Sequence, residues 1–264
     1  MTRPPKALPH DAPKLNTVSV AGCELATATW GSGTIDIVML HDGLGSIGQW
    51  RSVPAEVAAR TGRTVMAYER AGHGMSTPVP TGPWPADWLH REAIVFDRLL
   101  TALTIDLPFV VGHSDGGSTA LIHAATTNER VRGVLAIAPH SWVEDICRSS
   151  IVDMQANRGR IVAGLAKHHR APEAIFEAWS GVWVSTEFQT WDIRPLLAAI
   201  DVPTVIAQGS EDAYASDDQA ILTAKSIGTN GSWHLLDGLG HIAHHDDANQ
   251  VIDFIVDVWS RCDD

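Results

Sequence analysis

Three residues far apart in the 264-residue sequence have side chains suited to covalent catalysis by a serine: Ser114, Asp212 and His241. Ser114 lies in a G-x-S-x-G motif, GHSDG at residues 112–116, between an apolar run and a helix-like segment. A serine on so sharp a turn projects its hydroxyl above a sheet, and only small residues two positions before and after it avoid a clash. The motif therefore predicts a nucleophile, and the alternative is an ordinary turn with Ser114 as a helix cap.

A serine nucleophile needs a general base within reach. His241 directly follows a glycine turn, in the segment GLGH, and can reach across to Ser114. His244 and His245 are its competitors, and the pattern H-x-x-H-H-D-D at residues 241–247 could instead bind a metal. A zinc site would want further ligands, so we expect His241 as the base, no metal, and residues 244–247 as the polar start of the last helix.

The base in turn needs a carboxylate that fixes its tautomer and stabilises the imidazolium. Asp212 and Glu211 both lie in the segment GSED, directly after an apolar run at residues 203–208. Such a cluster is also typical of a polar turn, so the position after a strand is the stronger signal. We expect Asp212 to orient His241, with Glu211 as the alternative.

The segment HDGLGS, residues 41–46, follows another apolar run. Its glycines let the backbone approach a ligand, and a free N–H there could pair with the N–H of Asp115 to hold an oxyanion. Either Gly43 or Leu44 can supply that N–H, and a tight turn that caps the next helix is the alternative. We also expect His41 and Asp42 to contact substrate.

These loops must be positioned by regular elements, and the apolar patterning supplies them. Nearly continuous apolar runs predict buried parallel strands at Thr34–Leu40, Thr64–Tyr68, Pro108–Gly112, Val131–Ala138, Pro203–Gln208 and Ser232–Leu236. Helix-length segments provide the crossovers at Gln49–Arg60, Ala86–Leu103, Asp115–Thr127, Ser216–Ile227 and Asp246–Trp259. An antiparallel hairpin is expected at the sheet edge from Thr17–Val20 and Glu24–Trp30. The pattern predicts an α/β fold in which ligands bind beyond the C-terminal strand ends.

About sixty residues interrupt this alternation. We divide the chain into a core, residues 1–140 and 200–264, and an inserted helical lid at 141–199. The lid has four tryptophans, of which Trp142, Trp179 and Trp183 are expected to bind substrate, and this weakly favours an apolar or aromatic substrate. The segment HHR at residues 168–170 is expected on the exposed lid surface.

Composition restricts the function classes. The hydrophobic fraction of 45% supplies a core, and a formal charge of −12 disfavours nucleic acid and anionic membrane surfaces as partners. Three cysteines without CxxC spacing, Cys23, Cys147 and Cys262, indicate neither disulfides nor zinc thiolates. No apolar stretch reaches the roughly 18–20 residues of a membrane helix. We expect a cytoplasmic protein with a small-molecule substrate, and its oligomeric state, homo-oligomer included, is open.

The order Ser114, Asp212, His241 is that of the α/β-hydrolase superfamily, which the chain resembles from about Val18 to Trp259. The stretch YERAGHGMS, residues 68–76, looks like the R-x-G-x-G-x-S segment beside that family's active site. The chain departs from the family at Asp42, where His-Gly is usual. Some members use an aspartate nucleophile, but Asp115 in that role would place His113 where a small residue is needed.

The resemblance implies an α/β-hydrolase fold with a lid and a cofactor-independent serine hydrolase. We expect it to cleave a carboxylic ester or lactone through an acyl-enzyme. Hydrolysis of a carbon–carbon bond in a diketone-like substrate would need the same three residues. A different class, a hydrolase-like receptor for a hydrophobic small molecule, is separated by its slow or single turnover.

Overall fold

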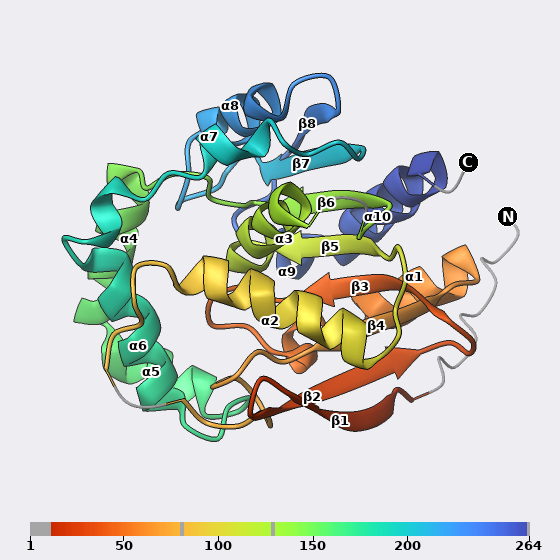
Figure 1. Ribbon diagram of the computed structural model, residues 1–264. Helices are drawn as coiled ribbons and strands as arrows, with labels where there is room; N and C mark the ends of the chain where they lie inside the picture. The colour runs from red at the N-terminus through yellow and green to blue at the C-terminus, as the bar shows by residue number, and fades with distance from the viewer. Residues whose placement is uncertain (1–11, 80–81, 128–129, 263–264) are drawn as a thin grey trace, which may run out of the picture.

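The computed structural model describes residues 12–79, 82–127 and 130–262, and a central sheet dominates it (Figure 1). The strands are ordered β1-β2-β4-β3-β5-β6-β7-β8. Their bounds are β1 Lys14–Val20, β2 Cys23–Trp30, β3 Ile35–Leu40, β4 Thr64–Tyr68, β5 Phe109–His113, β6 Gly133–Ile137, β7 Thr204–Gly209 and β8 Gly231–Leu236. β1 pairs with β2 and β2 with β4 in antiparallel fashion, and every later pairing is parallel. The predicted mostly parallel α/β sheet with an edge hairpin is confirmed.

Helices cover both faces of the sheet, as the alternating sequence pattern requires. One apolar layer joins the sheet to α2 (Trp88–Ala102), α3 (Asp115–Thr126) and α8 (Asp217–Ile227). The other joins it to α1 (Val53–Thr61) and α10 (Ala248–Cys262). Strands β4, β5 and β6 are buried along their whole length, which explains their uninterrupted apolar residues. Two buried layers hold the strands rigidly, so the loops at their ends start from fixed positions.

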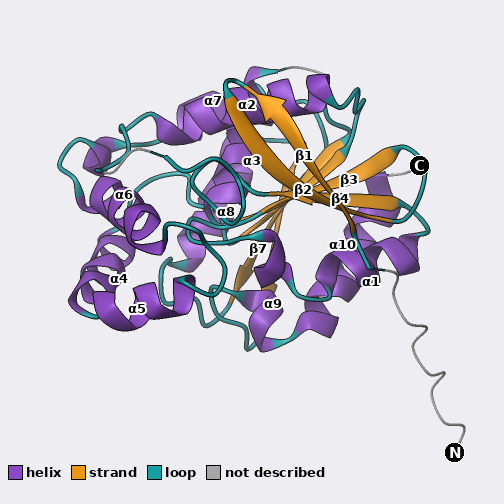
Figure 2. Ribbon diagram, turned by 90° about the horizontal axis from the view of Figure 1, so that it is seen from below, coloured by secondary structure: helices purple, strands orange, loops and turns teal. Residues whose placement is uncertain are grey.

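Residues 141–199 lie between β6 and β7 and contain most of the helices outside these layers. Their elements are α4 Asp145–Ala156, α5 Arg158–Leu165, α6 Pro172–Val184, a 3-10 turn η2 at Phe188–Thr190, and α7 Arg194–Leu197. An isolated bridge between Trp142 and Asp192 joins the two ends of this inserted segment. Figure 2 shows α4, α5 and α6 grouped together at one side of the sheet. The assignment of 141–199 as a separate lid stays a prediction.

Short elements complete the rim where the parallel strands end. The 3-10 turn η1 (Ile47–Trp50) follows β3, and α9 (Ala243–Asp246) precedes α10. Within the described ranges, none of the helices combines the length and the apolar character needed to cross a bilayer. The parallel strands β3, β5, β6, β7 and β8 all end at one rim of the sheet. The loops that the sequence analysis identified as candidate catalytic segments lie at this rim.

Candidate active site

Ser114 lies on the sharp turn between β5 and α3. Its backbone has φ 52°, a conformation that a non-glycine residue adopts only when the surroundings enforce it. A Cβ on Gly112 would lie 2.3 Å from the Gly116 carbonyl oxygen, and one on Gly116 would lie 2.3 Å from the Leu40 carbonyl oxygen. A side chain at either position would clash with a backbone carbonyl, so both positions require glycine, as the G-x-S-x-G motif predicts.

A continuous hydrogen-bonded chain joins Ser114, His241 and Asp212. The Ser114 hydroxyl lies 2.9 Å from His241 Nε2, and His241 Nδ1 lies 2.9 Å and 3.1 Å from the two carboxylate oxygens of Asp212. A carboxylate only accepts, so Nδ1 carries the proton and leaves Nε2 to accept from the serine. The side chain of Asp212 is 1% exposed, whereas Glu211 is exposed and takes no part.

Two groups keep Asp212 ionised within this chain. Burial alone raises the pKa of Asp212, but the hydrogen bonds and charge of His241 outweigh it and hold the pKa below its usual value. The Tyr214 N–H also donates to Asp212 Oδ1 over 2.8 Å. The carboxylate is therefore a fixed negative charge behind His241 at neutral pH.

The loop of residues 42–44 after β3 is held by its carbonyl oxygens. Arg70 Nη2 donates to the Asp42 carbonyl over 2.5 Å, and His73 Nε2 donates to the Gly43 carbonyl over 2.9 Å. The Leu44 carbonyl accepts from His169 Nε2 over 3.0 Å and from Gln49 Nε2 over 3.2 Å. Side chains from three separate segments therefore fix the orientation of this loop. The loop's N–H groups are fixed with it.

Only one of the two expected N–H donors of this loop is available. The Leu44 N–H donates to Asp42 Oδ1 over 2.9 Å, which commits it to the loop itself. Within the described part of the chain, the N–H groups of Gly43 and Asp115 have no acceptor, and both residues line the same cavity as Ser114. Of the two candidate oxyanion donors in this loop, Gly43 and Leu44, the free N–H therefore favours Gly43.

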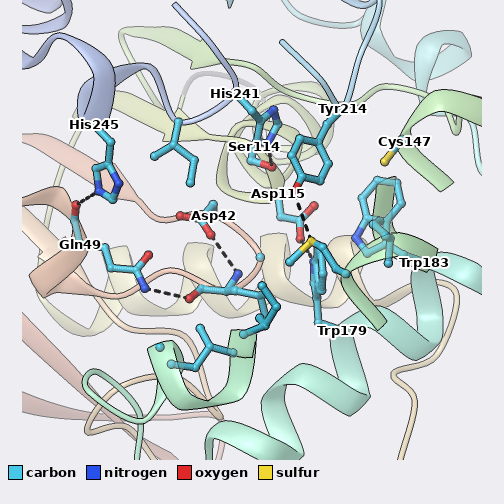
Figure 3. Close-up of a pocket in the computed structure, with 18 of the residues that line it drawn as sticks. Asp42, Gln49, Ser114, Asp115, Cys147, Trp179, Trp183, Tyr214, His241 and His245 are labelled. Carbon is cyan, nitrogen blue, oxygen red and sulfur yellow. Dashed lines mark hydrogen bonds between the residues drawn. The ribbon is translucent and has the colours of Figure 1, made fainter. Parts of the chain in front are cut away.

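Asp115 is buried beside the nucleophile with its carboxyl group directed into the site (Figure 3). Trp179 Nε1 donates to Asp115 Oδ2 over 2.8 Å. Burial raises the pKa of Asp115 to about 6, opposed by the charge of Arg70 and the indole N–H of Trp179. A Cβ on Gly43 would lie 2.0 Å from Trp179 Nε1 and 2.4 Å from Asp115 Oδ2, so only glycine fits at position 43.

A cavity of about 410 Å³ opens above Ser114. Its floor is formed by residues at the strand ends, and its far side by the inserted segment. The lining residues of the inserted segment are Cys147, Ile151, Met154, Ile161, Gly164, Leu165, Lys167, His168, Trp179 and Trp183. Most of these side chains are apolar, so the cavity suits a small substrate with an apolar or aromatic part.

The structure separates the predicted substrate-binding residues into two groups. Asp42, Trp179 and Trp183 line the cavity. His41 lies outside the lining, buried where its Nε2 accepts from the Arg70 N–H over 3.2 Å. Trp142 is also outside the lining, because its ring packs under the guanidinium of Arg194.

Sequence reasoning missed several lining residues, among them His140, Cys147 and Tyr214. His140 follows β6 and Tyr214 lies close behind β7, so their positions after strand ends were a usable signal. Cys147 offers no such signal. Burial raises the pKa of its thiol well above the ordinary value, so it is not a thiolate at neutral pH.

The expectation that residues 168–170 lie on the exposed surface is wrong for His169. This side chain is 6% exposed, accepts from the Gly74 N–H over 3.0 Å and donates to the Leu44 carbonyl.

The histidines of the alternative metal-binding pattern at residues 241–247 have other partners. His244 stacks on Trp50, and His245 Nε2 donates to the Gln49 carbonyl over 2.9 Å. Across the described ranges, no group of three His, Cys, Asp or Glu residues is arranged to hold a metal ion.

Comparison with known proteins identifies the family to which the fold belongs. Residues 37–174, more than half of the chain, match the model of the alpha/beta hydrolase fold family. The mouse protein named serine hydrolase BPHL (Mus musculus) is 29% identical over 209 residues, which cover 74% of this chain and 69% of the mouse protein.

Two solved structures resemble the fold over nearly the whole chain. A serine hydrolase involved in carbazole degradation, the CarC enzyme, superposes with a TM-score of 0.76 at 19% identity, covering 94% of this chain and 99% of the other. The enol-lactonase from Burkholderia xenovorans has a TM-score of 0.70 at 19% identity, covering 93% of this chain and all of the other. At this level of identity the likeness concerns the fold.

Proposed function

Because the chain belongs to the alpha/beta hydrolase fold family, we propose that it is a serine hydrolase that cleaves a carboxylic ester or lactone of a small apolar or aromatic substrate. The observation that carries this proposal is the hydrogen-bonded chain from Asp212 through His241 to Ser114, at the floor of an apolar cavity. The coarser conclusion, that the protein is a hydrolase of this fold, agrees with the mouse relative named as a serine hydrolase.

The proposed reaction begins at Ser114. Its Oγ attacks the carbonyl carbon while His241 Nε2, at 2.9 Å, takes the hydroxyl proton. Asp212 holds the tautomer of His241 that can accept this proton and stabilises the resulting imidazolium. The N–H groups of Gly43 and Asp115 bind the oxyanion that develops on the substrate oxygen.

Collapse of this intermediate releases the alcohol and leaves an acyl group on Ser114. His241 gives its proton to the departing oxygen, then takes a proton from the water that attacks the acyl group, and returns it to Ser114 Oγ as the bond to the acyl group breaks and the acid leaves. In a lactone the released alcohol stays attached to the acyl part. One set of residues therefore serves both substrate types, and the cavity shape selects between them.

Steady-state hydrolysis of a panel of activated esters and lactones tests the proposal, with acyl groups from acetyl to aromatic. We expect many turnovers per molecule, preference for apolar acyl groups, and a loss of about 10⁴–10⁶-fold in kcat for Ser114→Ala with the fold retained by circular dichroism. Binding without turnover, or a single turnover, would instead support a receptor. Near-normal turnover by Ser114→Ala would contradict a serine mechanism.

A further inference from the structure

A second aspartate–histidine pair lies near the nucleophile. It joins Asp42, the residue at which the chain departs from the usual His-Gly of its family, to His113, which directly precedes Ser114 in the sequence. The mechanism above gives neither side chain a task. Both are nevertheless placed among the reacting groups, since Asp42 lines the cavity and the ring of His113 lies 5.4 Å from that of His241.

Both ring nitrogens of His113 face acceptors. Nε2 lies 2.8 Å from the backbone carbonyl oxygen of His241, and Nδ1 lies 3.6 Å from Asp42 Oδ2. A carbonyl and a carboxylate only accept, so the ring satisfies both neighbours when it carries two N–H groups. The side chain of His113 is 1% exposed, whereas that of Asp42, which lines the cavity, is 18% exposed. This arrangement favours the doubly protonated ring over the neutral one.

The charges around His113 agree with that protonation state. Burial alone lowers the pKa of His113, but the nearby carboxylate of Asp42 outweighs it and raises the pKa above its ordinary value. Burial alone raises the pKa of Asp42, yet His113 holds it well below its usual range. The titratable groups that face His113 from the surrounding loops and from α9 are Asp42, His140, Asp212, His241, His244 and His245.

The pair touches both halves of the catalytic machinery. Asp42 Oδ1 accepts the Leu44 N–H next to the Gly43 amide, and a Cβ on Gly45 would lie 2.6 Å from Asp42 Oδ2, so the carboxylate is tightly seated. His113 holds the backbone of the base. The oxyanion loop and the base loop are thus connected through a residue adjacent to Ser114.

We propose that Asp42 and His113 form a positioning pair, in which Asp42 keeps His113 cationic and His113 fixes the backbone of His241 relative to Ser114 and the oxyanion loop. This inference rests on the proposed function, because it assigns the pair to the same reaction. Neither side chain hydrogen-bonds to the Ser114 hydroxyl or to the ring of His241. A displacement of about 1 Å in a catalytic group costs up to about 10²-fold in rate, so such support is worth a measurable part of kcat.

The test is a double-mutant cycle with Asp42→Ala, His113→Leu and both changes together. We expect each single variant to lower kcat by about 10-fold or more with little change in KM, and the double variant to be no worse than the poorer single variant. Asp97→Asn is the matched control, since Asp97 Oδ1 lies 3.4 Å from the buried His123 in the last turn of α3, whereas Ser114 precedes its first turn, and it should leave kcat unchanged. Additive losses in the double variant would overturn the proposal.

A pH series separates this role from simple structural support. Wild-type kcat should fall as pH rises through the pKa of His113, because the neutral ring presents a lone pair to the Asp42 carboxylate or abandons the His241 carbonyl. Asp42→Asn can accept the Leu44 N–H and donate to a neutral His113, so this variant should recover most of kcat and lose the high-pH fall. Identical pH profiles in the two proteins would contradict the proposal.

Nitrogen-15 NMR of the histidine rings gives a readout that does not need activity. We expect both ring nitrogens of His113 to be protonated at pH 7 in the wild type and one of them in Asp42→Asn. A neutral His113 in the wild type would overturn the proposal even if the variants lose activity. Absence of turnover in the wild type would contradict the proposed function instead, and the NMR result would still decide whether Asp42 holds a cation.

Discussion

The floor and the roof of the cavity differ in how they are built. The floor consists of the loops at residues 41–46, 112–116, 209–214 and 238–241, where backbone groups and buried polar side chains hold one another in place. The roof consists of α4, α5 and α6, whose contribution to the cavity is mostly apolar. Polar contacts between them run from Trp179 on α6 to Asp115 at the start of α3 (Figure 3) and from Ser150 on α4 to the Ala213 carbonyl.

This difference indicates which region sets the catalytic rate and which sets substrate binding. The stabilisation from hydrogen bonds and positioned backbone groups depends steeply on distance, so a change in the floor should act on kcat. Apolar contacts are tolerant, so a change in the roof should act on KM and on the choice of substrate. The predictions below test this division from the largest expected effect to the smallest.

Removing the charge behind the base should have the largest effect. Asp212→Asn leaves the shape of the floor intact but stabilises the wrong tautomer of His241, so kcat should fall by about 10⁴-fold. The neighbouring Glu211→Gln is the control and should change kcat little, because that side chain is exposed. The two variants are compared under saturating substrate. A greater loss in Glu211→Gln would transfer the role to Glu211.

The next prediction concerns the place where floor and roof meet. Gly43→Ala puts a Cβ against Trp179 and Asp115, which must displace either these side chains or the loop. Loss of one oxyanion donor costs about 10²–10³-fold in kcat, and we expect a loss in this range. In Gly48→Ala the nearest atom beyond the neighbouring residues would be His168 Nδ1, 3.5 Å from the added Cβ, so that variant serves as the steric control. Unchanged kcat in Gly43→Ala would remove the Gly43 amide from the mechanism.

Asp115 should give a smaller effect that depends on pH. Above a pH of about 6 its carboxyl group is ionised, and its negative charge opposes the oxyanion; below that pH the group is neutral. Asp115→Asn can still accept from Trp179 and lacks the charge. For a neutral ester, the ratio of kcat in this variant to wild-type kcat should rise from near one below pH 5 to about fivefold above pH 7.

The pH midpoint of that ratio provides a second comparison. Trp179→Phe removes the N–H that stabilises the ionised carboxylate, so the midpoint in this background should move to higher pH. A ratio that is constant across the pH range would show that Asp115 does not act on the oxyanion through its charge.

The roof should give the smallest effect. Ile161→Ala on α5 removes apolar contact with the substrate, and we expect KM for an apolar ester to rise by about 3–10-fold while kcat changes little. Val152→Ala, on the exposed side of α4, is the matched control and should leave both constants unchanged. A loss confined to kcat would mean that the roof takes part in the chemistry.

The sequence predicted the floor better than the roof. Ser114, Asp212 and His241 follow the strands β5, β7 and β8, and a parallel sheet brings such positions to one rim whatever the details of packing. The sequence could not decide whether Gly43 or Leu44 supplies the oxyanion N–H, because that depends on the conformation of the Asp42 side chain. Motif spacing locates a loop, whereas the conformation of individual side chains decides which N–H is free.

In the inserted segment, residues 141–199, composition predicted the apolar character of the cavity lining but few of the lining positions. Tryptophans are frequent there, but Trp142 packs under Arg194 and Trp191 stacks on Phe188, while Trp179 and Trp183 line the cavity. His169, in a polar run typical of a surface, is buried because the segment folds back over Gly74 and Leu44. Contacts between segments distant in sequence leave no local periodicity, so no local pattern could have predicted them.

The most direct test of the account is intact-protein mass spectrometry, with peptide mapping, after reaction with a fluorophosphonate. The account predicts one phosphonyl group per chain, located on Ser114, loss of ester hydrolysis in parallel with labelling, and no adduct in Ser114→Ala. A wild-type enzyme that turns over esters without being labelled, or an adduct that persists in Ser114→Ala, for example on Cys147, would contradict it.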